Sequence, residues 1–397
     1  MKILVVTPAC HFSRPGGAQE DMYATIALMQ SLGHQVGLYT LHGPNQSVDM
    51  LENIRKTYGV PVFTYVPDLA DHASWLKAVL KEPALFDRAA YPFELMARDP
   101  GFRTELKNWD VIFPFCSYAW PVLRAGKEVG IKTVFRSHNY EPTFFWEALE
   151  TSQKLNPLNW MRRMAKRRAE RLSVKYGDVT ASTRLREIAW YEQLKPKTIF
   201  ELTLAYLPPL VRGPRPQKNE GPLDIFYLGA SYNVSFHRRG VEVLLEEGVP
   251  KLKQVAPGAF RVHICGGKLP ERLKALCDGT NAICEDYVPD LEAFLDKMDL
   301  GVFPVLTGRS IKGKVFGSIC RAFPTVIPRI GASGYPLEDG KDVLYAETGD
   351  EYVDALLKLR DPALRATLSA GAAAVAEREF SQKAVRAQME RVLNALN

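Results

Sequence analysis

The sequence predicts an α/β protein made of two doubly wound halves, each with a parallel sheet covered by helices. Short apolar runs typical of buried strands alternate with segments of helical periodicity along most of the chain. A polar stretch rich in Pro and Gly interrupts this alternation at 208–222, near the middle of the sequence. The 397 residues suffice for two domains, and a content of 46% hydrophobic and 24% charged residues is that of a globular protein.

The first half opens with a strand at 2–7, a glycine loop, a helix at 18–32 and a second strand. We expect a first strand here rather than a signal peptide, because the apolar run is short. Gly16 and Gly17 stand at the strand–helix junction, where a missing side chain lets a ligand approach the backbone. The alternative is that they only shape a turn. The fingerprint GxGxxG is missing, which argues against a classical NAD site.

Further strands of the first half are expected at 35–40, 110–115, 132–136, 178–182 and 198–204. His138 directly follows the strand at 132–136. A histidine at a strand end can orient or polarise a reacting group, and Glu141 could set its tautomer or its protonation. A capping or structural histidine is the alternative.

The segment 160–175, WMRRMAKRRAERLSVK, predicts a basic amphipathic helix. It carries seven Lys and Arg residues against one acidic residue, Glu170, and has an apolar side that includes Trp160 and Met164. Such a helix can lie on an anionic membrane surface, and a solvated helix face is the alternative. The longest apolar window, 111–123, is broken by two prolines and is too short to span a bilayer.

The second half restarts with strands at 224–228 and 261–265, followed by Gly229 and Gly266. The stretch 300–337 then contains no Asp or Glu but five cations: Arg309, Lys312, Lys314, Arg321 and Arg329. It predicts a strand, a Gly/Ser/Lys loop, a helix and another strand. Backbone N–H groups at a helix start, together with lysines and arginines, form anion sites, here of the kind that binds the diphosphate of a nucleotide sugar. The alternative is a buried βαβ unit with solvated cations.

Composition excludes several classes of function. The formal net charge of +6 favours anionic partners, but no recognised nucleic-acid module accompanies the cations, so no nucleic-acid partner is expected. The six cysteines form no CxxC pair and are expected to be reduced thiols of a cytosolic protein. Neither metal-ligand spacing nor an Asp-x-Asp pair is present, so we expect no metal and no cofactor.

The order of these segments resembles the retaining glycosyltransferases of the GT-B fold, in the large family called group 1 or family four. The resemblance covers nearly the whole chain. No single motif decides it, but their order and spacing are fairly specific. It rests on PGGAQEDMYATIALMQSLGHQVGLYT, LDIFYLGASYNVSFHRRGVEVLLEEGVPKL, VHICGG, SIKGKVFGSICRAFPTVIPRIGASGYPLEDGKDVLYAETGDEYVDAL and FSQKAVRAQMERVL.

The resemblance implies a domain organisation. An acceptor-binding Rossmann-like domain would span 1–207, with a linker at 208–222. A nucleotide-sugar-binding Rossmann-like domain would span 223–380 and face the first across a cleft. The last helix, 381–397, would cross back and pack on the first domain.

The resemblance also implies roles for single residues. His138 would match the family's histidine near the donor sugar, and we expect His138, Lys314 and Glu141 to be the catalytic residues. Lys314, with Arg238 or Arg239, would neutralise the leaving diphosphate, in a fold that generally works without a bound metal. The other expected donor-binding residues are Gly16, Gly17, Gly229, Ser231, Gly266, Arg309, Lys312, Ser318 and Glu338.

One departure from the family concerns its two glutamates, which are separated by seven residues. The first falls at Arg309 and the second, which typically holds the nucleotide ribose, falls at Gly317. The donor could bind differently, with Ser318 or Glu338 taking over. The donor sugar could instead be acidic, which would suit Arg309, or the activity could be lost.

We therefore expect a cytosolic, metal-independent retaining glycosyltransferase of the hexosyltransferase type. It would use a nucleotide sugar, with UDP or GDP as the nucleotide. It would act on a lipid-linked or polysaccharide acceptor in bacterial surface-glycan biosynthesis, peripheral at the inner face of the cell membrane through 160–175. The alternatives are a non-catalytic GT-B relative that serves as a partner or scaffold subunit, and a sugar-nucleotide epimerase.

Overall fold

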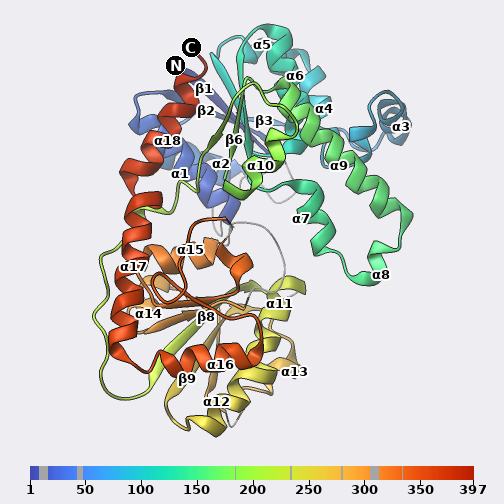
Figure 1. The fold of residues 1–397 in the computed structure, drawn as a ribbon. Coiled ribbons are helices and arrows are strands. Elements are labelled where there is room, and N and C mark those ends of the chain that lie inside the picture. The colour runs from blue at the N-terminus through green and yellow to red at the C-terminus, as the bar shows by residue number, and fades with distance from the viewer. Residues whose placement is uncertain are drawn as a thin grey trace. The chain divides into compact units, whose positions relative to one another are not determined.

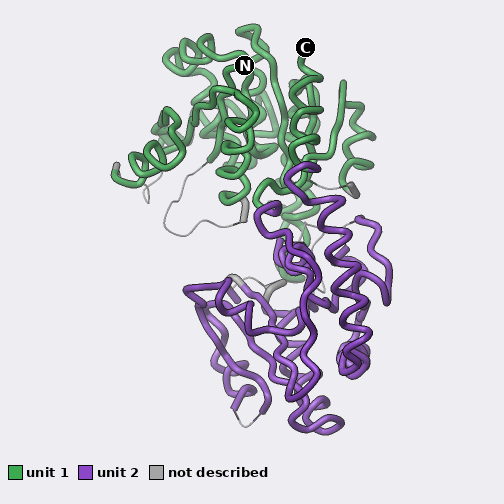
Figure 2. The backbone as a smooth tube through the Cα atoms, turned by 90° about the vertical axis from the view of Figure 1, so that its left-hand side faces the viewer, with its two compact units in different colours: residues 1–206, 385–397 green, residues 207–384 purple. Residues whose placement is uncertain are grey.

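The computed structural model covers the chain and describes residues 1–8, 17–42, 48–183, 185–232, 235–278, 280–304, 313–332 and 334–397 (Figure 1). The chain forms two compact units (Figure 2). Unit 1 comprises Met1–Tyr206 and Val385–Asn397, and unit 2 comprises Leu207–Ala384. Each unit contains one parallel sheet with helices around it, so the predicted α/β class with two Rossmann-like halves is confirmed.

Unit 1 is built on a seven-stranded parallel sheet in the order β3-β2-β1-β4-β5-β6-β7. The strands are β1 (Lys2–Thr7), β2 (Gln35–Leu41), β3 (Val62–Tyr65), β4 (Val111–Pro114), β5 (Lys132–Ser137), β6 (Val179–Ser182) and β7 (Ile199–Glu201). The direction of progression reverses between β1 and β4. Ligands of open α/β sheets bind beyond the carboxyl ends of strands at such a switch point.

The helices of unit 1 cover both faces of this sheet. They are α1 (Gly17–Ser31), α2 (Val48–Tyr58), α3 (His72–Lys81), α4 (Tyr91–Arg98), α5 (Pro100–Leu106), α6 (Trp120–Val129), α7 (Glu141–Ala148), α8 (Thr151–Lys154), α9 (Pro157–Tyr176), α10 (Leu185–Glu192) and α18 (Gln382–Asn394). Alternate residues of β1 point to opposite faces. Ile3 therefore belongs to a core shared with α1, α2 and α18, whereas Leu4 belongs to one shared with α4, α5 and α6.

The C-terminal helix α18 completes the core of unit 1. Val385, Met389, Val392 and Leu393 are buried in the same cluster as the first strand, and Figure 1 shows the helix alongside α1. The predicted return of the last helix to the N-terminal domain is thereby confirmed.

Unit 2 is built on a six-stranded sheet in the order β10-β9-β8-β11-β12-β13, with parallel pairing throughout. The strands are β8 (Leu223–Ser231), β9 (Phe260–Gly267), β10 (Ala282–Asp286), β11 (Leu300–Val302), β12 (Thr325–Ile327) and β13 (Leu344–Tyr345). The helices are α11 (Ser235–Glu242), α12 (Val249–Val255), α13 (Glu271–Lys274), α14 (Leu291–Leu295), α15 (Gly313–Cys320), α16 (Gly349–Lys358) and α17 (Pro362–Phe380). The switch point of this sheet lies between β8 and β11.

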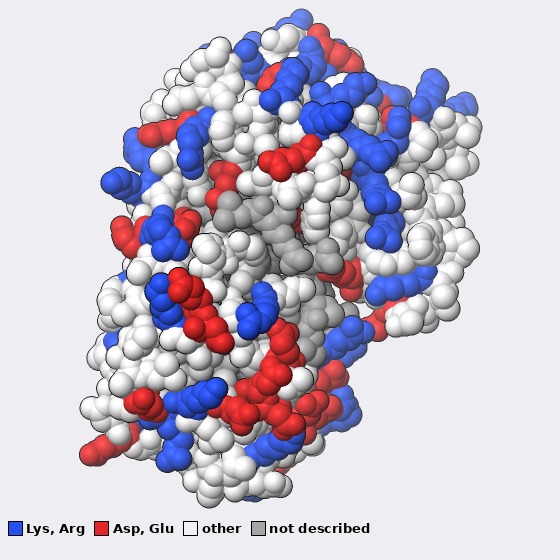
Figure 3. Space-filling model, viewed as in Figure 1, with Lys and Arg blue, Asp and Glu red and all other residues white. Residues whose placement is uncertain are grey.

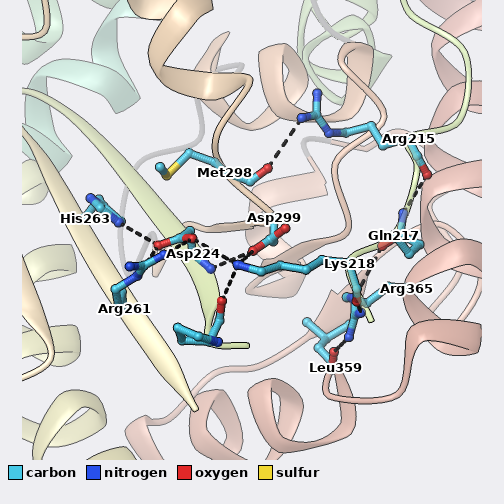
Figure 4. Close-up of polar contacts among 11 residues, drawn as sticks. Arg215, Gln217, Lys218, Asp224, Arg261, His263, Met298, Asp299, Leu359 and Arg365 are labelled. Carbon is cyan, nitrogen blue, oxygen red and sulfur yellow. Dashed lines mark hydrogen bonds and ion pairs between the residues drawn. The ribbon is translucent and has the colours of Figure 1, made fainter. Parts of the chain in front are cut away.

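The segment 208–222, expected as a linker, is packed into unit 2 by polar contacts (Figure 4). Lys218 Nζ lies 3.5 Å from Asp224 Oδ2 and 3.8 Å from Asp299 Oδ2. Asp224 also accepts hydrogen bonds from Arg261, and its Oδ1 lies 3.1 Å from His263 Nε2. These charged side chains lie at the amino ends of β8, β9 and β11. Ligands in this class of fold bind at the opposite, carboxyl ends of the strands.

Candidate functional site

Two glycines bring the ends of β8 and β9 together at the switch point of unit 2. A Cβ on Gly229 would lie 2.3 Å from the Tyr232 ring and 2.8 Å from the carbonyl oxygen of Cys265. Gly266 has a φ of +135°, and a Cβ there would lie 2.9 Å from Gly229. Tyr232 folds back beneath this contact and donates a hydrogen bond of 2.8 Å to Cys265 O. Close packing of the chain against itself therefore accounts for both glycines, and a ligand contact at either stays a prediction.

Lys314 stands in the first turn of α15, the helix that follows β11 across the switch point. Its side chain is partly exposed, but the Nζ atom is buried and makes no hydrogen bond to the described residues. The charge of this ammonium interacts with the Cys265 thiol at the end of β9. An unpaired cation, the free N–H groups of a helix start and a sheet switch point thus occur together in unit 2.

Burial dominates the electrostatics of Lys314. Desolvation lowers the pKa of this ammonium to about 7, with the Cys265 thiol acting weakly in the opposite direction. Burial raises the pKa of that thiol to about 12, so the thiol is neutral at physiological pH and supplies no counter-ion. An anion at this position would restore the proton to Lys314 and pair with it.

The other predicted donor residues of unit 2 are distributed around this point. Ser231 ends β8, and Arg238 and Arg239 lie on α11, where Arg238 Nε is 3.7 Å from Glu242. Ser318 is buried, and its hydroxyl is 2.9 Å from that of Thr325 inside the fold. We therefore leave Ser318 out of the candidate site.

Glu338 is exposed and pairs with Lys341 at 2.8 Å. Arg309 and Lys312 lie outside the described residues, so their predicted roles stay predictions.

Gly317, the position at which the sequence analysis expects a glutamate in the family, has little free space around it. A Cβ at this position would lie 3.3 Å from Arg321 Nη1 and 3.8 Å from Leu210. The Arg321 guanidinium donates to the carbonyl of Gly317 at 3.1 Å and pairs with Glu292 of α14. The space next to Gly317 is thus taken by a paired arginine, which a larger side chain would have to displace.

His138 follows β5 in unit 1, at the carboxyl end of the sheet, and is nearly buried. Its Nε2 atom lies 3.3 Å from Asp21 Oδ2, and its ring packs at a tilt against Phe115, with the two ring centroids 5.4 Å apart. Asp21 is fully buried on α1 and forms an ion pair of 3.0 Å with Arg136, which is also fully buried. A carboxylate at this position holds the imidazole in one orientation and favours a proton on the nitrogen that faces it.

Asp21 is the functional candidate that the sequence analysis missed. The carboxylate expected to set the state of His138 was Glu141, but the one that the structure places beside it is Asp21. Glu141 instead lies 3.5 Å from Lys166. The available signal was an acidic residue within the apolar stripe of a helix that follows a glycine loop. Gly17 begins that helix, and Gly16 lies outside the described residues.

The loop after β5 is held by side chains from two other elements, α9 and α10. Tyr140 N donates to Glu187 and Glu141 N donates to Glu170, both at 2.9 Å. Tyr191 donates to Glu170 at 2.8 Å, and its hydroxyl is 2.6 Å from that of Ser137. Burial raises the pKa of Glu170 to about 8. His138 is therefore presented on a fixed backbone.

Within the described ranges, no three His, Cys, Asp or Glu side chains come together in a group that could hold a metal ion. Among the described helices, none combines the length and the apolar character needed to cross a membrane.

Comparison with protein families identifies the second unit. Residues 222–361, about a third of the chain, match the family model described as "Glycosyl transferases group 1". Residues 222–361 form a group 1 glycosyl transferase domain. This domain contains both the Gly229–Gly266 contact at the ends of β8 and β9 and Lys314 on α15. A search of curated proteins finds no match.

Solved glycosyltransferase structures share the fold of the whole chain. Anabaena HepE in complex with UDP and glucose has a TM-score of 0.67 at 12% identity, with all of both chains covered. Sucrose-phosphate synthase from Thermosynechococcus elongatus has a TM-score of 0.66 at 14% identity, covering 100% of this chain and 98% of that one. A variant of S. aureus TarM in complex with UDP has a TM-score of 0.66 at 10% identity, covering 100% and 99%. The chain therefore has the GT-B fold.

Proposed function

We propose that this protein is a metal-independent retaining glycosyltransferase that transfers a hexosyl group from a nucleotide sugar. The observation that carries the proposal is the buried, unpaired ammonium of Lys314 at the switch point of a group 1 glycosyl transferase domain. A cation that has lost its hydration without gaining a partner destabilises the fold. A diphosphate would supply the missing partner, and Lys314 would then stabilise the negative charge that develops as the nucleotide leaves.

UDP is the nucleotide that we favour over GDP. HepE of Anabaena has been crystallised with UDP and with UDP-glucose, and S. aureus TarM with UDP. These two proteins share the fold of this chain, and the same nucleotide recurs in both.

Unit 1 would contribute His138 near the donor sugar. Asp21 would hold the imidazole in one orientation near that sugar, and Arg136 would pair with the Asp21 carboxylate inside the protein. We propose a lipid-linked or polysaccharide acceptor, in bacterial surface-glycan biosynthesis on the cytoplasmic side of the membrane. TarM, in complex with α-GlcNAc-glycerol, shares the fold of this chain and gives this choice its support.

Titration with UDP-glucose tests the donor site. Its diphosphate does not titrate near neutrality, so a change of affinity between pH 6 and 8.5 reports on the protein. We expect Lys314→Met to weaken binding by about 10- to 100-fold, the value of one hydrogen bond to a charged group. Lys341→Met, which removes an exposed cation of the same unit, is the control and should leave the dissociation constant unchanged.

The pH dependence follows from the pKa of Lys314. Below about pH 7 the ammonium is already charged, whereas above it binding must take up a proton. The wild type should therefore bind UDP-glucose more weakly as the pH rises from 7 to 8.5, and Lys314→Met should lose this slope. Failure of every UDP-, GDP- and TDP-linked compound to bind would refute the proposal and favour a non-catalytic subunit.

Product analysis separates the enzymatic alternatives. Transfer with retention gives a product whose anomeric configuration is that of the donor, which proton NMR reads from the anomeric coupling. A change of the donor sugar without any acceptor would identify an epimerase instead.

A further inference from the structure

One protruding part of unit 1 exposes an unusual amount of apolar surface. α8 and the first turns of α9 extend away from the sheet (Figure 1). Five large apolar side chains within ten residues are between 51% and 80% exposed, and we call them the apolar tip: Leu155, Leu158, Trp160, Met161 and Met164. Single exposed apolar residues are common, but a contiguous patch marks an interaction site.

The exposed face of α9 turns basic beyond the apolar tip. At 3.6 residues per turn, Arg167 and Arg171 continue the line of Trp160 and Met164, and Lys175 follows. All three are exposed, and across the part of the chain that the structure describes no carboxylate lies within ion-pair distance of them. We call them the basic stripe. Figure 3 shows Lys and Arg side chains in a row over α9 and an uncharged surface at its far end.

Three of the four remaining cations of this helix are engaged within unit 1. Lys166 is buried and lies 2.8 Å from Asp87, so it belongs to the interior of unit 1. Arg168 pairs with Glu82. Arg163 packs over the Trp146 ring at 4.6 Å. The predicted seven-cation helix therefore presents fewer free charges than its sequence suggests.

The apolar tip is ordered by contacts within unit 1 and does not need a partner in order to fold. The rings of Trp146 and Trp160 meet at 4.7 Å, and Arg163 covers them from α9. Asn156 caps the helix by accepting from Leu158 N. A preorganised surface loses little conformational entropy when a partner covers it.

We propose that the apolar tip inserts into an anionic lipid bilayer while the basic stripe rests on its head groups. A rise of 1.5 Å per residue places Trp160 about 10 Å from Arg167 along the helix. This matches the depth of roughly 5–10 Å to which interfacial helices bury their apolar side. The apolar end of the helix matches the hydrocarbon layer of a bilayer, and the cations that follow on the same helix face match its anionic head groups. The proposal does not depend on the donor site in unit 2.

Flotation with vesicles of phosphatidylcholine, with and without phosphatidylglycerol, tests this surface. The wild type should float with the anionic vesicles. Arg167→Gln with Arg171→Gln should weaken binding by roughly fivefold per cation and reduce its salt dependence, with Lys175 left in place. Leu155→Ser with Met161→Ser should weaken it at least tenfold. Brominated lipids should quench tryptophan emission in the wild type and less in Trp160→Phe.

Matched controls lie elsewhere on the molecule. Lys107→Gln with Lys297→Gln removes two exposed cations outside α9, and Val255→Ser with Tyr287→Ser removes two exposed apolar side chains of unit 2. Both should bind vesicles like the wild type. Absence of vesicle binding, or equal binding by the tip variant, would overturn the proposal. So would a lipid-free dimer that dissociates in the tip variant, because a second copy would then be the occupant.

Discussion

Among single residues, Glu170 lies inside unit 1 as a carboxyl group held by hydrogen-bond donors. Its two oxygens accept from Glu141 N and from the Tyr191 hydroxyl, and burial raises its pKa to about 8. The folded protein thus keeps a proton on Glu170 at neutral pH, whereas the unfolded chain releases it near pH 4.5. The contribution of this group to stability is full below pH 4.5 and is lost as the pH rises through 8.

We predict that Glu170→Gln flattens the dependence of stability on pH. Glutamine keeps an acceptor for Glu141 N but cannot ionise. Between pH 5 and 8.5 the wild type should lose on the order of 3 kcal/mol of unfolding free energy relative to the variant. Urea unfolding followed by circular dichroism measures this difference, and parallel curves for the two proteins would contradict the assignment.

A second prediction at the level of single residues concerns the stability effect of Lys314, a buried base where Glu170 is a buried acid. Its pKa of about 7 in the folded state lies below the value of 10.5 for an exposed lysine. The cost of burying its charge is full below pH 7 and disappears as the pH approaches 10.5. At pH 6, Lys314→Met should therefore be more stable than the wild type by about 1–3 kcal/mol, with the gap closing toward pH 10. A variant less stable than the wild type at pH 6 would show that Lys314 is paired.

For strands and helices, the close approach of β8 and β9 yields a prediction with an internal control. Gly229→Ala would bring a methyl group to within 2.3 Å of the Tyr232 ring, so we expect a loss of about 1–3 kcal/mol of unfolding free energy. Gly267→Ala, at the residue directly after Gly266, would bring its methyl group within 4 Å of no atom and should be close to neutral. Equal free energies of unfolding for the two variants would contradict the explanation that Gly229 is required by close packing against Tyr232.

The elements themselves were largely predictable from the sequence. Strands such as β1 and β8 are apolar runs long enough to be recognised, and the return of α18 followed from the family resemblance. The basic helix was predicted as a single charged surface, but its partners lie far along the chain. Asp87 neutralises Lys166 from 79 positions upstream, which no local pattern reveals. The packing of 208–222 against unit 2 could not be predicted for the same reason, since Lys218 contacts Asp299, 81 positions away, only in the folded chain.

On the scale of the whole molecule, the candidate site of unit 1 depends on both ends of the chain. Gln388 of α18 accepts from Thr203 N at 2.8 Å, and the carbonyl of Thr203 accepts from Arg136, which pairs with Asp21. Asp21 and Arg136 are separated by 115 positions, so neither the pair nor its link to α18 could be inferred from spacing.

Removal of residues 385–397 should unfold unit 1 and leave unit 2 folded. The deletion exposes the apolar face that Val385, Met389 and Val392 cover in the core of the first sheet. We expect limited proteolysis to degrade unit 1 while a fragment of unit 2 survives and still binds UDP-glucose. Two independent point variants, Met389→Ala and Val392→Ala, should each cost about 1–5 kcal/mol. An intact unit 1 in the deletion variant would contradict this role of α18.

The division of unit 1 between the two ends of the sequence also sets an order for its synthesis. Every segment of unit 2 is translated before Val385, whereas the first sheet is completed only by the final helix. The half of the protein that is begun first is therefore finished last. During that interval the apolar face that α18 covers in the finished unit 1 is exposed, and exposed apolar surface of this kind is what chaperones bind on incomplete chains.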